Sequence, residues 1–357
     1  MAKKILITGV CGFAGSSLAF ELKRLVENLE IIGVDNLSRP GSEQNRHRFK
    51  QSDIIFRHGD IRNPSDLEDL PKVDWVIDAA ANPSVLAGVS GATSSRQLME
   101  HNLIGTINLL EYCKRHGAGF VMVSTSRVYS AARLSALPMK VKNEAFVPQF
   151  AGAREPGFSP AGLTEDFSTQ PPLSLYGSAK LASEILILEY GLAFDFPTFV
   201  NRCGVLAGAG QFGKPDQGIF TFWIHSCRWK RPLKYIGFGG MGHQVRDCLH
   251  PRDLAALIAK QMRQPKKSGS VLNVSGGLAN SMSLAQLSKW CASRFGRHKI
   301  KSDSAVRRYD VPWLVLDSAR ATAEWNWRPA VKLENILDEI ARHAESHPEW
   351  LDLSNGA

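Results

Sequence analysis

The sequence predicts an α/β fold, in which a doubly wound parallel sheet is followed by a smaller α/β lobe. Short apolar runs of strand length alternate with amphipathic stretches of helical length through residues 1–200, which is the pattern of repeated βαβ units. The 357 residues suffice for about two domains, and 44% apolar with 22% charged residues is ordinary for a globular chain. After residue 208 the alternation gives way to short strands, loops and helices.

The first elements form a strand–turn–helix–strand unit. Apolar residues 5–8 end at Gly9, a helix is expected over residues 14–29, and residues 31–34 form a second buried strand that runs into Asp35. The alternation then continues in the same order. The further predicted elements are a strand at 54–56, a helix at 64–70, a strand at 73–77, a helix at 96–116, a strand at 120–123, a helix at 175–194 and a strand at 198–200.

Residues 130–174 interrupt this rhythm, because they are rich in proline, glycine and serine. A long segment without periodicity inside a compact domain is usually a functional loop or an insertion. We therefore expect residues 1–200, with 130–174 inserted as a loop, to form the first domain. Residues 201–357 form the second lobe, with some segments returning to the first domain, and the polar tail from Ser346 is expected to fray.

Composition and charge narrow the class of protein. No apolar stretch has membrane-spanning length, and the apolar start breaks at Thr8-Gly9, too early for a signal peptide. Six widely spaced cysteines without a C-x-x-C pair favour reduced thiols, a cytoplasmic location and no metal site. The net charge of +9 favours anionic partners, namely nucleic acid, acidic lipid or phosphorylated metabolites. The basic run over residues 228–234 is compatible with nucleic acid, with a diphosphate or with a solvated face.

A glycine-rich turn joins the first strand to the first helix, in the sequence Gly9-Val10-Cys11-Gly12-Phe13-Ala14-Gly15. Glycines at this place let the backbone approach a pyrophosphate, which the helix N-terminus attracts. Asp35 lies about 20 residues beyond the last glycine, where a carboxylate accepts hydrogen bonds from ribose hydroxyls and repels a 2′-phosphate. This pattern predicts a Rossmann-type site that prefers NAD, while the nearby Arg39 leaves NADP as the alternative.

A second motif, Tyr176-Gly177-Ser178-Ala179-Lys180, places a phenol and an ammonium four residues apart on the predicted helix 175–194. The positive charge stabilises the phenolate, which can then exchange a proton with a substrate hydroxyl. Thr125 follows the strand predicted at 120–123, at the end of the sheet where ligands bind in such folds. Its hydroxyl is placed to hydrogen-bond the reacting oxygen.

Together these motifs resemble the extended short-chain dehydrogenase/reductase family, which contains the NAD-dependent nucleotide-sugar epimerases and dehydratases. The resemblance runs from residue 3 to about residue 330, and it implies that Thr125, Tyr176 and Lys180 are catalytic. The NAD-binding residues that it implies are Gly9, Gly12, Phe13, Ala14, Gly15, Asp35, Asn36, Asp60, Ile61, Ala79, Ala80, Ala81, Asn102, Tyr176 and Lys180. The substrate-binding residues that it implies are Val205, Gln217, Arg246, Arg307 and Asp310, with the two arginines on the diphosphate.

Finer matches favour an epimerase that works through a transient keto sugar. The family's dehydratases carry an acid pair where this chain has Ser126-Arg127. The runs 35–39, 216–218 and 244–250 resemble the CDP-paratose 2-epimerase (CDP-tyvelose epimerase) subfamily. A UDP-hexose 4-epimerase or another NAD-dependent sugar-nucleotide oxidoreductase needs the same catalytic residues and stays open. An RNA-binding or regulatory member of the fold is the non-enzymatic alternative.

Several positions depart from the family pattern, so the base, the sugar and the epimerised carbon stay open. The departures are Asp78 for histidine, Ser130 for glycine, Val205 for asparagine or serine, and Ala207 for tyrosine. Cys203 is either a catalytic acid–base group or a buried thiol. The expected partners are a CDP- or UDP-linked nucleotide sugar and further copies of the chain in a homodimer or homotetramer, with no nucleic acid and no membrane.

Overall fold

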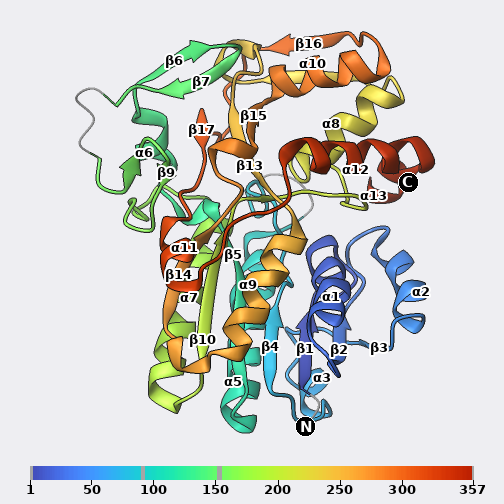
Figure 1. Cartoon of the computed structure of the whole chain (residues 1–357), viewed down its shortest axis with the longest axis vertical. Helices are drawn as coiled ribbons and strands as arrows, with labels where there is room; N and C mark the ends of the chain where they lie inside the picture. The colour runs from blue at the N-terminus through green and yellow to red at the C-terminus, as the bar shows by residue number, and fades with distance from the viewer. Residues whose placement is uncertain (1–2, 90–92, 151–154, 356–357) are drawn as a thin grey trace. The chain divides into compact units, whose positions relative to one another are not determined.

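The computed structural model describes residues 3–89, 93–150 and 155–355, which divide into two compact units (Figure 1). Each unit is assembled from three segments that are distant in sequence. Unit 1 comprises the chain up to Thr125 together with Leu175–Arg202 and Pro251–Leu272. Unit 2 comprises Ser126–Ser174, Cys203–His250 and the chain from Asn273 onward.

A seven-stranded sheet forms the centre of unit 1. Its strands lie in the order β14-β10-β5-β4-β1-β2-β3, and neighbouring strands from β5 to β3 run parallel. The order reverses between β1 and β4, and ligands bind outside the carboxyl ends of the strands at such a point. The predicted doubly wound α/β class is confirmed. The strands are β1 (Lys4–Thr8), β2 (Glu30–Asp35), β3 (Ile54–His58), β4 (Trp75–Asp78), β5 (Gly119–Thr125), β10 (Thr198–Cys203) and β14 (Ser270–Val274).

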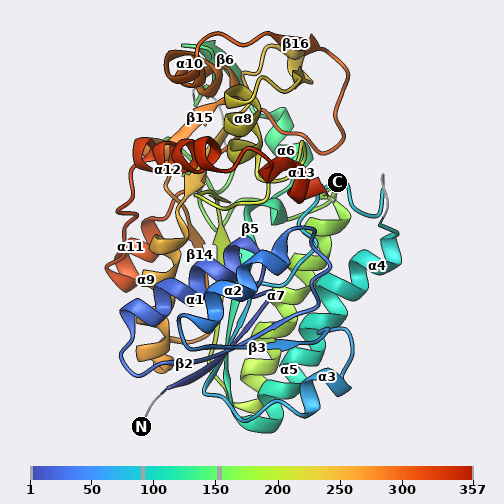
Figure 2. The same ribbon diagram turned by 90° about the vertical axis from the view of Figure 1, so that its right-hand side faces the viewer.

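Helices cover both faces of this sheet. Figure 2 shows α1 with α9 on one face and α5 with α7 on the other, and each pair is in contact. Leu6, Val76, Leu109 and Phe120 belong to a buried cluster of unit 1, and the removal of such apolar surface from water holds helices on a sheet. The helices of unit 1 are α1 (Phe13–Leu25), α2 (Asn45–Lys50), α3 (Ser65–Glu68), α4 (Ser95–Met99), α5 (Gly105–His116), α7 (Leu175–Phe194) and α9 (Pro251–Arg263).

Two predicted helices differ from the structure. The helix expected over 14–29 ends at Leu25, because the backbone of Val26 is extended, with φ of −123° and ψ of 112°. The helix expected over 96–116 consists of α4 and α5 joined by a π-helical turn, η2 (Glu100–Ile104). Helix α2 lies in a stretch for which the sequence predicts no element.

Unit 2 contains a small sheet packed with helices. Strand β13 pairs with β11, β15 and β17. Helix α8 packs against both α10 and α12, where Trp223, Leu287 and Ile340 share a buried cluster. The strands are β11 (Val205–Leu206), β12 (Leu233–Ile236), β13 (Val245–Leu249), β15 (Ser281–Ser283), β16 (Ile300–Asp303) and β17 (Trp313–Leu314). The helices are α8 (Ile219–Arg228), α10 (Leu284–Phe295), α11 (Ala319–Trp325), α12 (Leu333–Ser346) and α13 (Trp350–Asn355).

The 130–174 segment is more regular than its composition predicts. It contains α6 (Ala131–Ala136) and two antiparallel hairpins, and residues 151–154 lie outside the described part of the chain. The segment belongs to unit 2, where the amide of Phe146 donates to the carbonyl of His243 over 2.9 Å. The hairpin strands are β6 (Met139–Lys142), β7 (Ala145–Pro148), β8 (Phe158–Ser159) and β9 (Gly162–Leu163).

The predicted fraying of the tail from Ser346 is wrong for the residues described. Helix α12 reaches Ser346, and α13 follows it as far as Asn355. Trp350 and Leu351 are buried in unit 2, at 7% and 2% exposure, while Glu349 and Asn355 are exposed. The polar composition of this stretch therefore reflects its exposed residues and not the buried Trp350 and Leu351, which pack α13 into unit 2.

Candidate active site

The glycine turn connects β1 to α1 in unit 1. Gly9 has a positive φ of 63°, and a Cβ atom there would lie 2.8 Å from the Cα of Ala80. Gly12 is the N-cap of α1 and carries no side chain that could occupy the helix end. A Cβ on Gly15 would overlap the carbonyl of Gly9, so α1 packs directly on the turn. The result is a bare backbone turn at a helix N-terminus, which suits a phosphate.

Asp35 ends β2 beside this turn. Its carboxylate accepts a hydrogen bond of 2.9 Å from the amide of Cys11 and one of 2.8 Å from the amide of Leu37. Burial raises the pKa of Asp35 from its ordinary value, and these backbone hydrogen bonds oppose the shift. The acceptor oxygens are thus held next to the glycine turn, as the predicted ribose contact requires.

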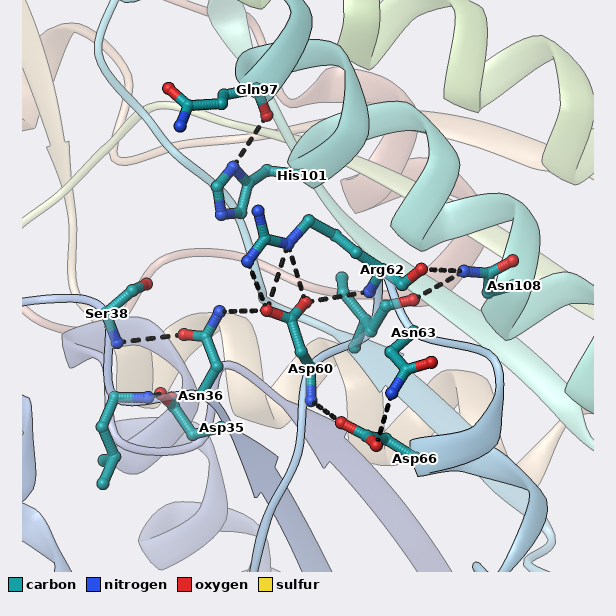
Figure 3. A network of polar contacts seen from close by, with 12 residues as sticks. Asp35, Asn36, Ser38, Asp60, Arg62, Asn63, Asp66, Gln97, His101 and Asn108 are labelled. Atoms are coloured by element: carbon teal, nitrogen blue, oxygen red, sulfur yellow. Dashed lines mark hydrogen bonds and ion pairs between the residues drawn. The ribbon is translucent and has the colours of Figure 1, made fainter. Parts of the chain in front are cut away.

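Asp60 and Ile61, two of the predicted NAD-binding residues, follow β3 at the start of a turn. Figure 3 shows Asp60 in contact with Arg62 and Asn36. The carboxylate of Asp60 accepts from Arg62 Nη2 at 2.6 Å and from Asn36 Nδ2 at 2.9 Å. Burial raises the pKa of Asp60, but the hydrogen bonds from Arg62 and Asn36 outweigh it and bring the pKa below its ordinary value. The carbonyl of Ile61 accepts from Asn108 Nδ2 at 2.8 Å, which ties the turn to α5.

The turn after β4 holds Ala79, Ala80 and Ala81, and Asn102 fastens it. Asn102 Oδ1 accepts from the amide of Asn82 at 2.8 Å, and its Nδ2 donates to the Asn82 carbonyl at 3.0 Å. Asp78 is fully buried and accepts from the hydroxyls of Thr8 at 2.7 Å and Thr106 at 3.2 Å. Asp78 therefore links β1, β4 and α5 inside unit 1.

The three candidate catalytic residues also belong to unit 1. Thr125 is the last residue of β5, Tyr176 is the second residue of α7, and Lys180 lies one turn further along that helix. Helix α7 packs against β5. Tyr176 and Lys180 are buried, at 7% and 2% exposure. The phenol and the ammonium therefore share one buried face of α7, as the four-residue spacing predicts.

A buried ion pair beside these residues escaped the sequence analysis. Glu184 continues the row of Tyr176 and Lys180 by another four residues, and its carboxylate accepts from Arg202 Nη2 at 2.7 Å and Nε at 3.0 Å. The hydroxyl of Ser124 donates to the same carboxylate at 2.5 Å. The network joins α7, β5 and β10 next to Thr125. Its one sequence signal is the repeat of four residues along α7, since the arginine is remote in sequence.

In unit 2 the structure brings together the two predicted substrate arginines and Asp310. Arg246 Nη2 donates to Asp310 Oδ1 at 2.8 Å, and Gln244 Nε2 donates to Asp310 Oδ2 at 3.2 Å. Burial lowers the pKa of Arg246; the charge of Asp310 opposes this shift and that of Arg307 adds to it. Arg246 and Arg307 are therefore close enough to repel each other, and a diphosphate placed against them relieves that repulsion.

The other predicted substrate residues lie on β11 and the segment that follows it. Val205 pairs in register with Cys248 of β13. Gln217 closes a tight turn with Lys214, in which each amide donates to the other residue's carbonyl, at 3.1 and 2.8 Å. Arg307 Nη2 donates to the carbonyl of Pro215 inside that turn at 3.4 Å. Gln217 and Arg307 thus meet on the same turn of unit 2.

Comparison with known proteins identifies the family. Residues 5–275 match the model of the NAD dependent epimerase/dehydratase family. The chain belongs to this family. It is 31% identical to CDP-paratose 2-epimerase of Salmonella typhi over 349 residues, which cover 94% of this chain and 98% of that protein. It is 26% identical to UDP-glucuronate 4-epimerase of Thermodesulfobacterium geofontis, with 97% of both chains covered.

Solved structures share the fold of this epimerase/dehydratase. UDP-glucose 4-epimerase of Thermotoga maritima, solved with UDP-glucose, superimposes with a TM-score of 0.75 at 23% identity, covering 96% of this chain and 99% of that one. UDP-glucose 4-epimerase of Thermus thermophilus, solved with NAD, gives a TM-score of 0.74 at 23% identity with the same coverage. NAD is the cofactor of the family. The bare glycine turn fits its pyrophosphate, and the carboxylate of Asp35 fits its adenosine ribose.

Proposed function

We propose that the chain is an NAD-dependent epimerase of a nucleotide-diphosphate sugar, acting through a transient keto sugar. The observation that carries the proposal is the buried Tyr176–Lys180 pair on α7, packed against the strand that ends in Thr125. The residues after Thr125 are Ser126 and Arg127, so this turn lacks the carboxylates that water elimination requires. Epimerisation needs only proton transfer and reversible hydride transfer.

The residues then have distinct tasks. Tyr176 as phenolate takes the proton from a sugar hydroxyl, Lys180 stabilises the negative charge, and Thr125 hydrogen-bonds the same oxygen. NAD, when bound, would supply the reversible acceptor for a hydride from the carbon that bears this oxygen. The keto sugar rotates in the site between the outgoing and the returning hydride transfer. Hydride therefore returns to the opposite face of the sugar, and Tyr176 gives the proton back. Substrate and product have the same oxidation state, and no external reductant is consumed.

The substrate we propose is a CDP-linked sugar of the kind handled by CDP-paratose 2-epimerase. The support is the 31% identity to that enzyme along nearly the full length of both chains. A UDP-hexose is the second candidate, because a UDP-glucose 4-epimerase and a UDP-glucuronate 4-epimerase are also relatives, each at 26% identity. The paired Arg246 and Arg307 serve the diphosphate in either substrate.

The experiment presents purified protein with CDP- and UDP-linked sugars that carry deuterium at the candidate carbons. We expect one of them to be epimerised with the label retained, because hydride leaves and returns at one place. Tyr176→Phe is the control for a background reaction. Loss of the label to solvent contradicts the keto-sugar route and indicates deprotonation next to a carbonyl, with a base such as Cys203. Conversion of no nucleotide sugar contradicts the proposed function itself.

The basic run 228–234 gives no support to an RNA-binding role. Lys230 Nζ donates to three carbonyls at the end of α10, at 3.0 to 3.2 Å. Arg231 forms two hydrogen bonds with Asp352, and Lys234 pairs with Asp303 at 2.9 Å. These three cations hydrogen-bond or pair with groups of unit 2 itself. We therefore propose a nucleotide sugar and no nucleic acid as the anionic partner.

Two further proposals concern assembly and location. We propose a homodimer or homotetramer, supported by apolar side chains on the outer side of α7, where Ile185 is 56% and Leu192 81% exposed. We propose a cytoplasmic location, supported by six buried cysteines, none of which forms a disulfide in the described part of the chain. Among the described residues, no helix is both long enough and apolar enough to cross a membrane.

A further inference from the structure

The segment of residues 207–218 connects β11 to α8 in unit 2 and forms no helix or strand of its own. It carries Gln217, and the carbonyl of Pro215 in it accepts from Arg307 at 3.4 Å. We call this segment the substrate loop. A loop of this length needs contacts from outside to keep one conformation, because its own backbone has few hydrogen-bond partners.

Helix α13 supplies such contacts from the far end of the chain. Trp350 Nε1 donates to the carbonyl of Gln211 at 2.8 Å in a buried environment. The indole ring stacks on Phe212 with the ring centres 5.2 Å apart and 13° between the planes. A Cβ on Gly213 would lie 3.0 Å from Leu351, so the loop backbone runs directly along α13.

Helix α13 is itself held firmly in unit 2. Arg231 binds both oxygens of Asp352, at 2.5 and 2.6 Å, and donates to the carbonyl of Pro348 at 3.3 Å. The ring of His343 on α12 meets the face of Trp350 edge-on at 4.7 Å between centres. The indole of Trp350 therefore packs between His343 of α12 and Phe212 of the substrate loop.

The side chain of Gln211 carries the constraint further. Its Nε2 donates to the carbonyl of Leu206 on β11 at 2.5 Å, and its Oε1 accepts from the hydroxyl of Thr221 on α8 at 3.1 Å. One residue therefore joins β11, α8 and, through its backbone carbonyl, α13. The loop is braced at Gln211 and Phe212 by α13 and meets Arg307 at Pro215.

We infer that Trp350 is a positioning residue for the substrate. The C-terminal helix braces the substrate loop so that Gln217 and the Pro215 carbonyl stay in register with Arg307, and this inference rests on the proposed function. The indole of Trp350 contacts the substrate loop and His343 of α12, whereas the candidate catalytic residues belong to unit 1. Its loss should therefore weaken substrate binding while leaving the chemical step and the NAD content unchanged.

The test compares two tryptophans of unit 2 in the NAD-loaded, full-length protein. Trp350→Phe keeps an aromatic face for Phe212 but removes the donor to Gln211. Trp229→Phe is the matched control, because Trp229 Nε1 donates to the carbonyl of Ala344 at the same 2.8 Å without touching the loop. Trp350→Ala removes the stacking on Phe212 as well. If Trp350→Ala does not fold, the test rests on Trp350→Phe.

We expect Trp350→Phe to raise KM for the nucleotide sugar roughly three- to tenfold, the effect of one hydrogen bond, with kcat within about twofold. Amide hydrogen exchange in residues 207–218 should become faster. Trp229→Phe should leave KM and the loop exchange at wild-type values. An unchanged KM in Trp350→Phe, or an equal rise in both variants, overturns the inference. If the wild type converts no nucleotide sugar, the proposed function fails, and the inference is then judged by exchange alone: equal loop exchange in both variants overturns it.

Discussion

The three candidate catalytic residues have different proposed roles in the transfer of the sugar hydroxyl proton. Tyr176→Phe removes the group that starts the oxidation but keeps the ring, so NAD should remain bound while turnover falls about 10²- to 10⁴-fold. Lys180→Ala should be comparably severe, because the phenolate loses its positive neighbour. Thr125→Ala should cost less, since the hydroxyl orients and does not transfer the proton. Steady-state kinetics together with the NAD released on denaturation check all three. Retained turnover in Tyr176→Phe excludes this residue as the acid–base group.

We propose that Arg246 and Arg307 of unit 2 bind the charged diphosphate of the substrate and take no part in proton or hydride transfer. Arg246→Ala should raise the dissociation constant of the nucleotide sugar about 10- to 100-fold, because a hydrogen bond to a charged group contributes roughly 1.5–3 kcal/mol. The NAD content should stay constant. Arg294→Ala is the control, because this arginine of the same unit pairs with Asp338 at 2.6 Å and is not a predicted substrate residue. Calorimetric titration measures both. Equal affinity of Arg246→Ala and wild type would assign Arg246 a purely structural task.

The buried pair of Glu184 and Arg202 acts on the elements that carry the site. Their side chains are 2% and 8% exposed, so Glu184→Gln leaves a charged guanidinium without its counter-ion inside the protein. Such a change typically lowers the free energy of unfolding by about 3–5 kcal/mol. The exposed pair of Arg96 and Glu100 is the control, and Glu100→Gln should cost less than about 1 kcal/mol. Urea unfolding compares them; similar losses in both variants would contradict a supporting role for the buried pair.

Helix α8 contributes a pH dependence of stability through His225. Burial, and then the charges of His343, His347 and Arg231, lower the pKa of His225 to about 3. The unfolded chain binds this proton below about pH 6.5 and the folded chain does not, so unfolding becomes easier as the pH falls from 6.5. The contribution is at most about 1.4 kcal/mol per pH unit. His225→Gln should be less sensitive to acid than the wild type between pH 7 and pH 4.5. The carboxyl of Asp247, whose pKa burial raises to about 6, opposes this trend in both proteins and cancels in the comparison.

At the scale of the whole molecule, the exposed apolar face of α7 offers a test of the proposed homodimer or homotetramer. Ile185 and Leu192 are 56% and 81% exposed on the side of the helix opposite Tyr176 and Lys180. A second copy of the chain that presents the same face would bury these side chains in a two-fold interface. Replacement of Ile185 and Leu192 by lysine should convert the assembly to monomers in light scattering, without loss of bound NAD. An unchanged mass for the double variant would show that this face is not the interface.

The features that the sequence predicts correctly are those set by local patterns of residues. The glycine turn with Asp35, the strands up to β5 and the Tyr176–Lys180 spacing are set by periodicity and turn chemistry within a few tens of residues, and the fold class and the family that they predict are confirmed. The role of Asp78 could not be read in this way. Its partners Thr8 and Thr106 become neighbours only when β1, β4 and α5 come together.

The sequence by itself determined the doubly wound fold, the NAD family and the identity of the candidate catalytic residues, because a helix or a βα turn displays its chemistry at fixed short spacings. Only the tertiary structure decided which remote partners hold that chemistry in place. Arg202 meets Glu184, and Trp350 meets Gln211, which is 139 residues away in sequence, because each buried polar group must find a partner wherever packing brings one. The burial of Trp350 and Leu351 likewise made a helix of a tail that its composition marks as polar.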